Sequence, residues 1–367
     1  MKRVLEVSCN GMYNGGVQHV IMEITRNLSC KYNIDVLVFT KGPDYFDKEF
    51  QSYGGKIFRL PDKQNKLRKI TWYFDGLRIY RGTLKILREN GPYDVIHCHN
   101  YFKSAYCLMA AKKAGVPVRI VHSHNDFSNV SYFFTRKILW FIERRIMNRN
   151  STDRIGCSRA AADFLFSRNV SSDVIYNGID IHRFDDNNDL APYIANTRIR
   201  LLHVGNFSPQ KNQLLLADIG NALKCLNIDF VMTLVGGDSE YKNEVQSRVS
   251  ELGLNDKFVF LPQNSDIPEL MGESDLFLFP SAYEGLGIVV IEAQASGLHC
   301  IVSKAVPEEA DLGNIEYIDS KDPMVWAKKI EQKVKSGQER VYVNMDSYDI
   351  SKVITNYEKI YENNCKR

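Results

Sequence analysis

Two carboxylates stand eight residues apart, on either side of a glycine-rich turn. Glu284 lies in a loop after the apolar run Leu276–Phe279, and Glu292 lies in the helix that is predicted to follow. The loop contains Gly285, Leu286 and Gly287. Glycines leave backbone N–H groups accessible at the start of a helix, where they bind anions. A carboxylate in a small, apolar helix needs a polar partner, and sugar hydroxyls would serve. The segment therefore indicates a site for a phosphorylated ligand rich in hydroxyl groups.

The two carboxylates are not spaced like the catalytic pair of a retaining glycosidase, whose carboxyl groups lie about 5–5.5 Å apart. Eight residues of helix rise about 12 Å. Separate roles in binding one ligand therefore fit Glu284 and Glu292 better than a joint role in hydrolysis. A structural ion pair or a solvated face remains the alternative for Glu292 taken alone.

A second loop follows a predicted strand in the second half of the chain, over residues 204–212, and contains Asn206 and Lys211. We expect Ser208 to cap the helix that follows and Pro209 to lie in its first turn. Lys211 then lies near the positive end of the helix dipole, which disfavours a cation unless an anionic ligand shares the site. A solvated surface lysine is the alternative.

A third loop follows the first predicted strand and contains Gly15 and Gly16 ahead of a helix. This pair lets N–H groups approach an anion at the helix N-terminus. The loop lacks the GxGxxG pattern, and no acidic residue ends the second strand to hold a ribose, which excludes a dinucleotide-dependent dehydrogenase. A turn that needs glycine only for its backbone angles is the alternative.

The composition is that of a globular chain with two domains, since 44% of the 367 residues are hydrophobic and 25% are charged. Short apolar strands alternate with helical patterns, which predicts an α/β fold with parallel sheets. The eight cysteines include no Cys-x-x-Cys pair and indicate reduced thiols. We expect no signal peptide and no apolar run of the roughly 18 residues that span a bilayer.

The predicted strands are distributed along most of the length of the chain. They lie at residues 3–8, 34–40, 56–61, 94–99, 118–124, 153–158, 173–179, 200–204, 230–235, 258–261, 276–279 and 300–303. A polar stretch at residues 185–189 is predicted to be a linker.

The charges are divided unevenly along the chain. Residues 1–172 contain 28 Lys and Arg but 14 Asp and Glu, whereas the remainder contains 19 and 30. The basic half favours an anionic partner such as a polyphosphate or an anionic membrane surface. We expect no nucleic acid, because the sequence has no zinc finger, no RNA-recognition signature and no basic low-complexity arm.

Taken together, these motifs resemble those of the family-four retaining glycosyltransferases, which use nucleotide sugars and have the GT-B fold. The family pattern of two Glu separated by seven residues matches Glu284 and Glu292. Gly15-Gly16-Val17 and residues 176–180 and 204–211 match further elements in the expected order. The resemblance runs from residue 1 to at least residue 305 and points to the bacterial capsule, exopolysaccharide and O-antigen type.

The resemblance implies two Rossmann-like domains with parallel sheets that face a cleft. The acceptor-binding domain would comprise residues 1–175 and 348–367, with the C-terminal helix returning to it. The donor-binding domain would comprise residues 176–347.

The resemblance also implies roles for the motif residues. Glu292 would bind the ribose hydroxyls of the nucleotide, and Glu284 with the backbone of residues 285–287 would hold the donor sugar. Lys211 and the amides of residues 15–16 would neutralise the diphosphate.

A histidine would contact the sugar near its anomeric centre, and we prefer His124 to His122 because it lies nearer the strand end. The catalytic residues would then be His124, Glu284 and Lys211. One position departs from the family, since Asn206 stands where Arg is common. An amide loses the charge-assisted, fork-shaped contact that Arg makes with a diphosphate.

The implied reaction transfers a hexose or N-acetylhexosamine from a nucleotide diphosphate sugar, taken to be UDP-linked, with retention of configuration. Fixed N–H groups, a helix N-terminus and Lys211 would stabilise the leaving diphosphate. No Asp-x-Asp motif follows a strand, so we expect neither a metal nor a cofactor. His97-Cys98-His99 is interpreted as a strand end with no fourth metal ligand nearby.

The expected acceptor is a glycan on a polyprenyl diphosphate. We expect a cytoplasmic protein that associates peripherally with the inner face of the cell membrane through the basic domain. The side chains assigned to this anionic membrane surface are Lys63, Lys66, Arg68, Lys69, Arg136, Lys137, Arg144, Arg145 and Arg149, with aromatics at 72–74, 133–134 and 140–141.

Two other functions remain open. A sugar-nucleotide epimerase or hydrolase on the same scaffold would turn over the donor without an acceptor. A non-catalytic sugar-nucleotide-binding protein, which Asn206 makes conceivable, would bind the donor and release no nucleotide.

Overall fold

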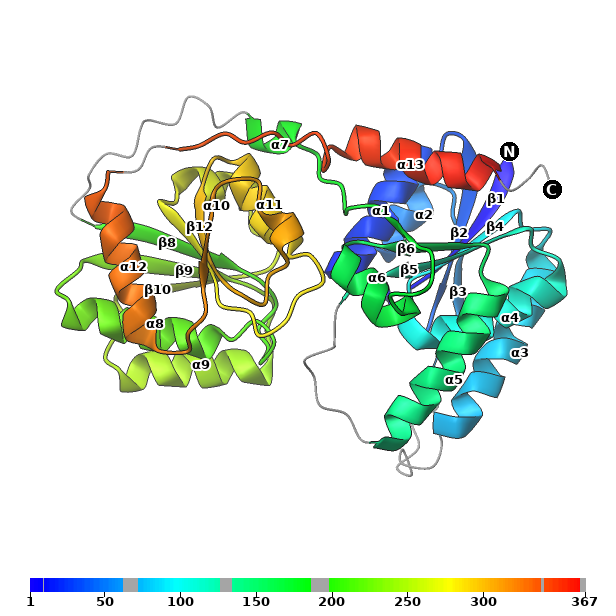
Figure 1. Cartoon of the computed structure of the whole chain (residues 1–367), viewed down its shortest axis with the longest axis horizontal. Coiled ribbons are helices and arrows are strands. Elements are labelled where there is room, and N and C mark those ends of the chain that lie inside the picture. The colour runs from blue at the N-terminus through cyan, green and yellow to red at the C-terminus, as the bar shows by residue number, and fades with distance from the viewer. Residues whose placement is uncertain (9, 62–71, 126–133, 186–197, 338–339, 364–367) are drawn as a thin grey trace. The chain divides into compact units, whose positions relative to one another are not determined.

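The computed structural model describes residues 1–8, 10–61, 72–125, 134–185, 198–337 and 340–363, and the chain divides into two compact units (Figure 1). The first unit comprises Met1–Gly178 and Ile350–Arg367, and the second comprises Ile179–Asp349. The boundaries expected from the sequence fall two or three residues before these.

The first unit is built on a parallel sheet in the order β3-β2-β1-β4-β5-β6-β7. Its strands are β1 (Lys2–Val7), β2 (Tyr32–Val38), β3 (Ile57–Arg59), β4 (Val95–Cys98), β5 (Val118–Ser123), β6 (Asp153–Gly156) and β7 (Asp173–Val174). The strand order reverses between β1 and β4, so their carboxyl ends mark the point where ligands bind in doubly wound sheets.

Helices cover both faces of this sheet. They are α1 (Gly16–Leu28), α2 (Asp47–Ser52), α3 (Trp72–Asn90), α4 (Ser104–Ala114), α5 (Phe134–Asn150), α6 (Arg159–Phe166) and α13 (Ile350–Asn363). Val4 of β1 belongs to a core shared with Ile21 of α1 and Tyr357 of α13. Leu5, the next residue, belongs to a separate core with Leu108 of α4. Side chains that alternate between two buried faces are typical of a parallel α/β sheet.

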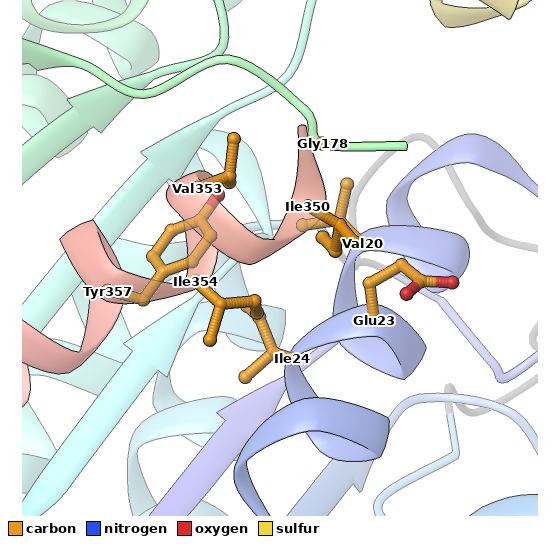
Figure 2. A pocket seen from close by; sticks show the side chains of 8 residues that line it. All are labelled: Val20, Glu23, Ile24, Gly178, Ile350, Val353, Ile354 and Tyr357. Carbon is orange, nitrogen blue, oxygen red and sulfur yellow. The ribbon is translucent and has the colours of Figure 1, made fainter. Parts of the chain in front are cut away.

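The last helix of the chain, α13, packs against the first unit. One face of it is buried, and consists of Val353, Ile354, Tyr357 and Tyr361. Figure 2 shows part of this face against Val20 and Ile24 of α1. An ion pair between Lys2 Nζ and Glu362 Oε2, 2.6 Å apart, joins the two ends of the described chain. Exposed pairs contribute about 0–1 kcal/mol, so the apolar face is what holds the helix.

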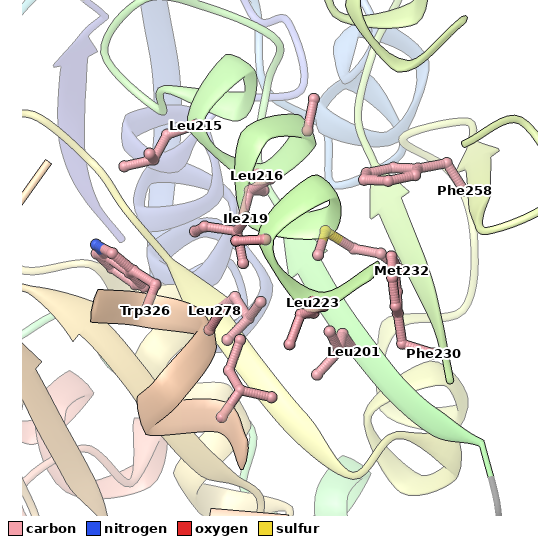
Figure 3. Close-up of a cluster of buried hydrophobic side chains, with 14 of the residues drawn as sticks. Leu201, Leu215, Leu216, Ile219, Leu223, Phe230, Met232, Phe258, Leu278 and Trp326 are labelled. Atoms are coloured by element: carbon pink, nitrogen blue, oxygen red, sulfur yellow. The ribbon is translucent and has the colours of Figure 1, made fainter. Parts of the chain in front are cut away.

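The second unit has a parallel sheet in the order β10-β9-β8-β11-β12-β13. Its strands are β8 (Ile199–Val204), β9 (Phe230–Val235), β10 (Phe258–Leu261), β11 (Leu276–Phe279), β12 (His299–Ser303) and β13 (Ile315–Ile318). Its helices are α7 (His182–Asp185), α8 (Gln213–Cys225), α9 (Glu240–Glu251), α10 (Ile267–Glu273), α11 (Ile288–Ala295) and α12 (Pro323–Lys335). Leu216 and Ile219 of α8 lie in a buried cluster with Trp326 of α12 (Figure 3).

The predicted α/β class with two parallel sheets is confirmed. The sequence did not predict β13, an edge strand whose residues are mostly half-buried and lack a clear apolar run. The strand predicted at residues 173–179 is shortened to Asp173–Val174. Residues 186–189 of the predicted linker lie outside the described residues. Among the described residues, no helix combines the length and the hydropathy that a membrane span requires.

Candidate functional site

The strand order of the second sheet also reverses once, between β8 and β11. The loops that follow these two strands therefore meet at a switch point. They are held together by a backbone hydrogen bond of 2.7 Å from Ala282 N to Gln210 O. The side chain of Asn212 donates to Pro280 O at 3.3 Å, which ties the loops a second time. Two motifs that lie 68 to 72 residues apart in sequence at these contacts are thus joined at one edge of the sheet.

Lys211 and Glu284 come together at this switch point. Lys211 Nζ lies 2.6 Å from Glu284 Oε1, and the side chains are 20% and 6% exposed. The ammonium also lies 4.5 Å from the ring centroid of Phe279, the last residue of β11. The structure therefore brings together the two residues that the sequence assigned to the diphosphate and the donor sugar.

The helix after β8 begins later than predicted. Helix α8 starts at Gln213, with Asn212 as its N-cap in the left-handed region at φ +56°, so Ser208 is not the cap. Ser208 instead accepts a hydrogen bond at its carbonyl oxygen from Lys211 N, 3.0 Å away. This turn places Lys211 ahead of the helix, where its side chain reaches across to the neighbouring loop.

The glycine-rich turn after β11 begins a helix as predicted. Gly287 is the N-cap of α11 and has φ +79°, a backbone conformation that favours glycine. Gly285 and Leu286 are buried in the same turn. Glu292 is half-buried within α11, and Asn206 is exposed in the loop after β8.

Sequence reasoning missed two side chains that support this edge. Gln213 donates from Nε2 to the carbonyl of Asn206 at 3.1 Å and accepts from Ser208 N at 3.3 Å. Gln210 donates from Nε2 to the carbonyl of Tyr283 at 3.0 Å. The sequence carried no signal for Gln213, because its burial and its place at the start of α8 are seen only in the structure.

In the first unit, Gly15 is the N-cap of α1 and Gly16 is its first residue. A Cβ on Gly15 would lie 2.5 Å from the ring of Tyr13, whereas nothing lies within 4 Å of a Cβ on Gly16. Neither glycine has a positive φ, so backbone angles do not explain them. The close approach of the Tyr13 ring explains why residue 15 is glycine. Gly16 leaves open space beside the first turn of α1.

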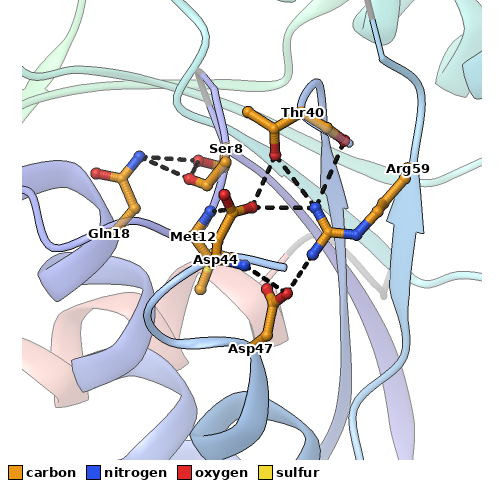
Figure 4. Close-up of polar contacts among 8 residues, drawn as sticks. Ser8, Met12, Gln18, Thr40, Asp44, Asp47 and Arg59 are labelled. Atoms are coloured by element: carbon orange, nitrogen blue, oxygen red, sulfur yellow. Dashed lines mark hydrogen bonds and ion pairs between the residues drawn. The ribbon is translucent and has the colours of Figure 1, made fainter. Parts of the chain in front are cut away.

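A polar network holds the loop ahead of α1 (Figure 4). Asp44 accepts hydrogen bonds from Met12 N at 3.2 Å and from the hydroxyl of Thr40 at 2.7 Å, and pairs with Arg59 at 3.0 Å. Burial alone would raise the pKa of Asp44, but these hydrogen bonds outweigh burial and lower it. Gln18 of α1 donates from Nε2 to Ser8 Oγ at 3.1 Å. The loop is therefore fixed from both the β1 side and the α2 side.

Four histidines gather on the face of the first sheet that α13 covers. His97 and His99 come from β4 and its end, and His122 and His124 come from β5 and its end. His124 Nε2 lies 2.7 Å from His99 Nδ1, and His99 Nε2 lies 2.8 Å from the Glu6 carboxylate. The structure thus places His124 in a buried chain of hydrogen bonds, with His122 beside it at 4.0 Å between ring centroids.

A third histidine, which the sequence did not indicate, lies beside His97 and His99. Ring nitrogens of His97, His99 and His122 all lie within 4.8 Å of one another. His122 is on β5, which pairs in parallel with β4, so alternate residues of both strands face the same side of the sheet. This proximity depends on strand pairing, which the sequence does not show.

The ionisation of this cluster follows from its burial. Burial would raise the pKa of Glu6, but the adjacent His97 and His99 lower it to about 2. Burial, together with His97, lowers the pKa of His99 to about 4. Burial also lowers the pKa of His122 and His124 well below the usual range. The carboxyl group of Glu6 is therefore ionised at neutral pH, whereas burial favours the neutral form of His99, His122 and His124.

The basic helix α5 is only partly exposed. Phe141 is 57% exposed, and Ile138 and Ile142 are close to half exposed on the same face. Arg144 turns inward and donates to the carbonyls of residues 164 and 165 at the end of α6. Of the assigned membrane surface, the side chains of residues 63–69, 72–74 and 133–134 lie outside the described residues.

Two family models match the chain. The model described as Glycosyltransferase Family 4 matches residues 14–183, and the model described as Glycosyl transferases group 1 matches residues 186–348. EpsF of Bacillus subtilis (strain 168) is 32% identical over 351 residues, which cover 92% of this chain and 89% of EpsF. The chain belongs to the family-four glycosyltransferases. The resemblance predicted from the motifs is confirmed.

This glycosyltransferase is also similar to an Escherichia coli enzyme named UDP-Gal:alpha-D-GlcNAc-diphosphoundecaprenol alpha-1,3-galactosyltransferase. The two are 27% identical over 305 residues, or 78% of this chain and 76% of the relative. Among solved structures, Anabaena Alr3699/HepE in complex with UDP and glucose aligns with a TM-score of 0.76 and 19% identity. That alignment covers 98% of this chain and 99% of the other, and supports the GT-B fold.

Proposed function

We propose that this glycosyltransferase moves a hexose or N-acetylhexosamine from a UDP-linked donor to a glycan carried on a polyprenyl diphosphate, with retention of configuration, in cell-surface polysaccharide synthesis. The observation that carries the proposal is the contact between Lys211 and Glu284 at the switch point of the second sheet. A buried carboxylate beside a cation, at the edge where parallel sheets bind ligands, suits a substrate with both a diphosphate and sugar hydroxyls. The UDP donor and lipid-linked acceptor are supported by the names of the Escherichia coli relative and the Anabaena complex.

The donor would be held by the second unit. Glu292 binds the ribose hydroxyls, Glu284 binds sugar hydroxyls, and the backbone of residues 285–287 contributes N–H donors at the start of α11. The half-buried position of Glu292 supports its role, because a partly desolvated carboxylate gains from bidentate hydroxyl contacts.

Departure of the nucleotide leaves negative charge on the diphosphate. Lys211 and the N–H groups at the start of α11 would stabilise that charge, and the uncovered start of α1 at Gly15 and Gly16 would add to it. These groups take the place of a divalent metal in the transfer step. The exposed amide of Asn206 contributes a hydrogen bond and no charge.

His124 would act as a hydrogen-bond acceptor for the donor sugar. Glu6 accepts a hydrogen bond from His99 Nε2, so His99 Nδ1 carries a lone pair and accepts from His124 Nε2. His124 Nδ1 is then unprotonated and makes no hydrogen bond in the described structure. This fixed tautomer supports His124 over His122, whose two ring nitrogens both lack partners.

The acceptor would reach the enzyme from a membrane, with which α5 associates peripherally. Ile138, Phe141 and Ile142 form an exposed apolar face, and the guanidinium of Arg145 lies 5.6 Å from the ring centroid of Phe141. Apolar side chains flanked by cations suit an anionic headgroup region.

The proposal is tested by nucleotide release from a panel of UDP- and GDP-sugars, with and without a polyprenyl-diphosphate sugar acceptor. Release of UDP that requires the acceptor is the expected result. Release that does not require the acceptor would favour a hydrolase, and conversion of the donor into an isomeric nucleotide sugar without release of UDP would favour an epimerase. Tight UDP binding with no release, for any acceptor in the panel, would favour a binding protein.

A further inference from the structure

The cluster around Glu6 is incomplete as a set of hydrogen-bonding groups. His122 is fully buried, and neither of its ring nitrogens has a hydrogen-bond partner; His97 Nε2 also lacks one. A buried polar group without a partner costs about 1–3 kcal/mol, and several in one place call for an unseen occupant.

The only charged neighbours that Glu6 could have in this part of the described structure are histidines. Among the described residues, Glu6 receives hydrogen bonds and ion-pair contacts from His97, His99 and Tyr361 and from no Lys or Arg. A bound cation would pair with this buried carboxylate.

The hydrogen bonds of the cluster leave one ring nitrogen of His97 and one of His99 as possible ligand atoms. Tyr361 donates its hydroxyl to Glu6 at 2.9 Å, so His97 Nδ1 donates to the Tyr361 oxygen at 3.0 Å, and His97 Nε2 is left as a lone pair. Glu6 accepts a hydrogen bond from the Nε2–H group of His99, so His99 Nδ1 carries a lone pair, which lies 2.7 Å from His124 Nε2. A carboxylate that holds the far side of a ligand histidine is the usual support of a protein metal site.

We propose that His97, His99 and His122 form a buried site for a divalent transition-metal ion such as Zn²⁺, beneath α13. Neutral imidazoles are the form that binds such ions. Tetrahedral Zn–N bonds of about 2.0–2.1 Å place ligand nitrogens about 3.3–3.4 Å apart. The observed spread, within 4.8 Å, closes by rotation of His122, whose ring makes no hydrogen bond that resists it. Coordination by His99 Nδ1 replaces the hydrogen bond from His124.

The site is structural in character and adjoins His124, which is proposed to contact the donor sugar. All its residues belong to the first unit, and two helical tyrosines at its edge, Tyr357 and Tyr361, come from α13. A bound ion would therefore tie the last helix to β1, β4 and β5 through Tyr361 and Glu6.

The test measures metal content and uses no activity. Full-length protein without a histidine tag is stripped with chelator, incubated with Zn²⁺ or Co²⁺, separated from free ion by gel filtration and analysed by elemental mass spectrometry. We expect one ion per chain for the wild type, visible d–d absorption with Co²⁺, and a Zn²⁺-dependent rise in Tm.

The decisive variant is His122→Leu. It removes no hydrogen bond, so the metal-free variant should be at least as stable as metal-free wild type, yet it should retain no ion and show no rise in Tm. His19→Ala changes an exposed histidine on α1 and should bind as the wild type does. Wild-type protein that retains no ion, or a His122→Leu variant that retains as much as the wild type, overturns the proposal. The first result would leave ordered water as the occupant of the cluster.

Discussion

Lys211 Nζ and Glu284 Oε1 lie 2.6 Å apart, so two residues proposed to hold different parts of one substrate neutralise each other before it binds. The pair is mostly buried, and neither charge is left without a partner while the site is empty. A diphosphate that binds at Lys211 would therefore meet an ammonium group that is already largely desolvated. Glu284 could then accept a hydrogen bond from a sugar hydroxyl.

Lys211→Met should lower kcat by the equivalent of about 2–4 kcal/mol, as for other preorganised groups that stabilise an anion. It should also lower Tm, because the buried Glu284 carboxylate loses its counter-ion. The double variant Lys211→Met, Glu284→Gln should recover Tm and leave kcat low. A double variant that recovers kcat would show that Lys211 serves stability alone.

Glu292→Ala should weaken binding of UDP, because the ribose loses a charged acceptor for its hydroxyl pair. Isothermal titration with UDP measures the effect directly. Glu273→Ala, an exposed carboxylate at the end of α10 in the same unit, is the matched control and should leave the affinity unchanged. Equal affinities for the two variants would remove the role proposed for Glu292.

Transfer should persist in EDTA and should not be stimulated by Mg²⁺ or Mn²⁺, because Lys211 and helix N-termini stabilise the leaving diphosphate in the proposed mechanism. The measurement is acceptor-dependent UDP release with and without chelator. Complete loss in EDTA that Mg²⁺ or Mn²⁺ restores would contradict the mechanism. Dependence on Zn²⁺ alone would point instead to the histidine cluster of the first unit.

Glu143 on α5 should make the first unit less stable as the pH rises. Burial raises the pKa of Glu143 from 4.5 to about 7, against hydrogen bonding by Tyr106 and the charge of Arg136. Between pH 4.5 and about 7, the Glu143 carboxyl group is protonated in the folded state and ionised in the unfolded state. The free energy of unfolding therefore falls as the pH rises through this range and is constant above it. Glu143→Gln should gain up to about 3 kcal/mol at pH 8 and nothing at pH 4. Denaturant unfolding at both pH values measures this, with the exposed Glu89→Gln as a control that should show no gain.

Phe141→Ser with Ile142→Ser should reduce binding to vesicles of anionic lipid at low salt, because these side chains form the exposed apolar face of α5. Cosedimentation measures the bound fraction. Val325→Ser changes an apolar residue of the second unit that is 43% exposed, and it should bind as the wild type does. A wild-type protein that does not sediment with the vesicles would contradict the proposed membrane association.

The sequence predicted most of what local patterns encode. The turn of residues 285–287 and the strands that lead to it were predicted, because glycine spacing and apolar runs are short-range signals. It did not predict that Lys211 and Glu284 are in contact, since that depends on how β8 and β11 pair.

The partners of His124 were missed for the same reason. Glu6 is a single polar residue in an apolar strand, and its contact with His99 joins residues 93 positions apart. The start of α8 was misplaced because Asn212 adopts a left-handed conformation that residue type alone does not require. Long-range register and one unusual backbone angle thus account for the differences at the site.

The packing of α13 on the first unit sets an order for folding during synthesis. Residues 179–349 complete the second unit before the ribosome has made α13, whereas β1, made first, still lacks Tyr357 and Tyr361 over its buried face. Until the last residues emerge, Glu6 and the histidines of β4 and β5 face water instead of a helix. The half of the protein that is translated first is therefore the half that finishes folding last.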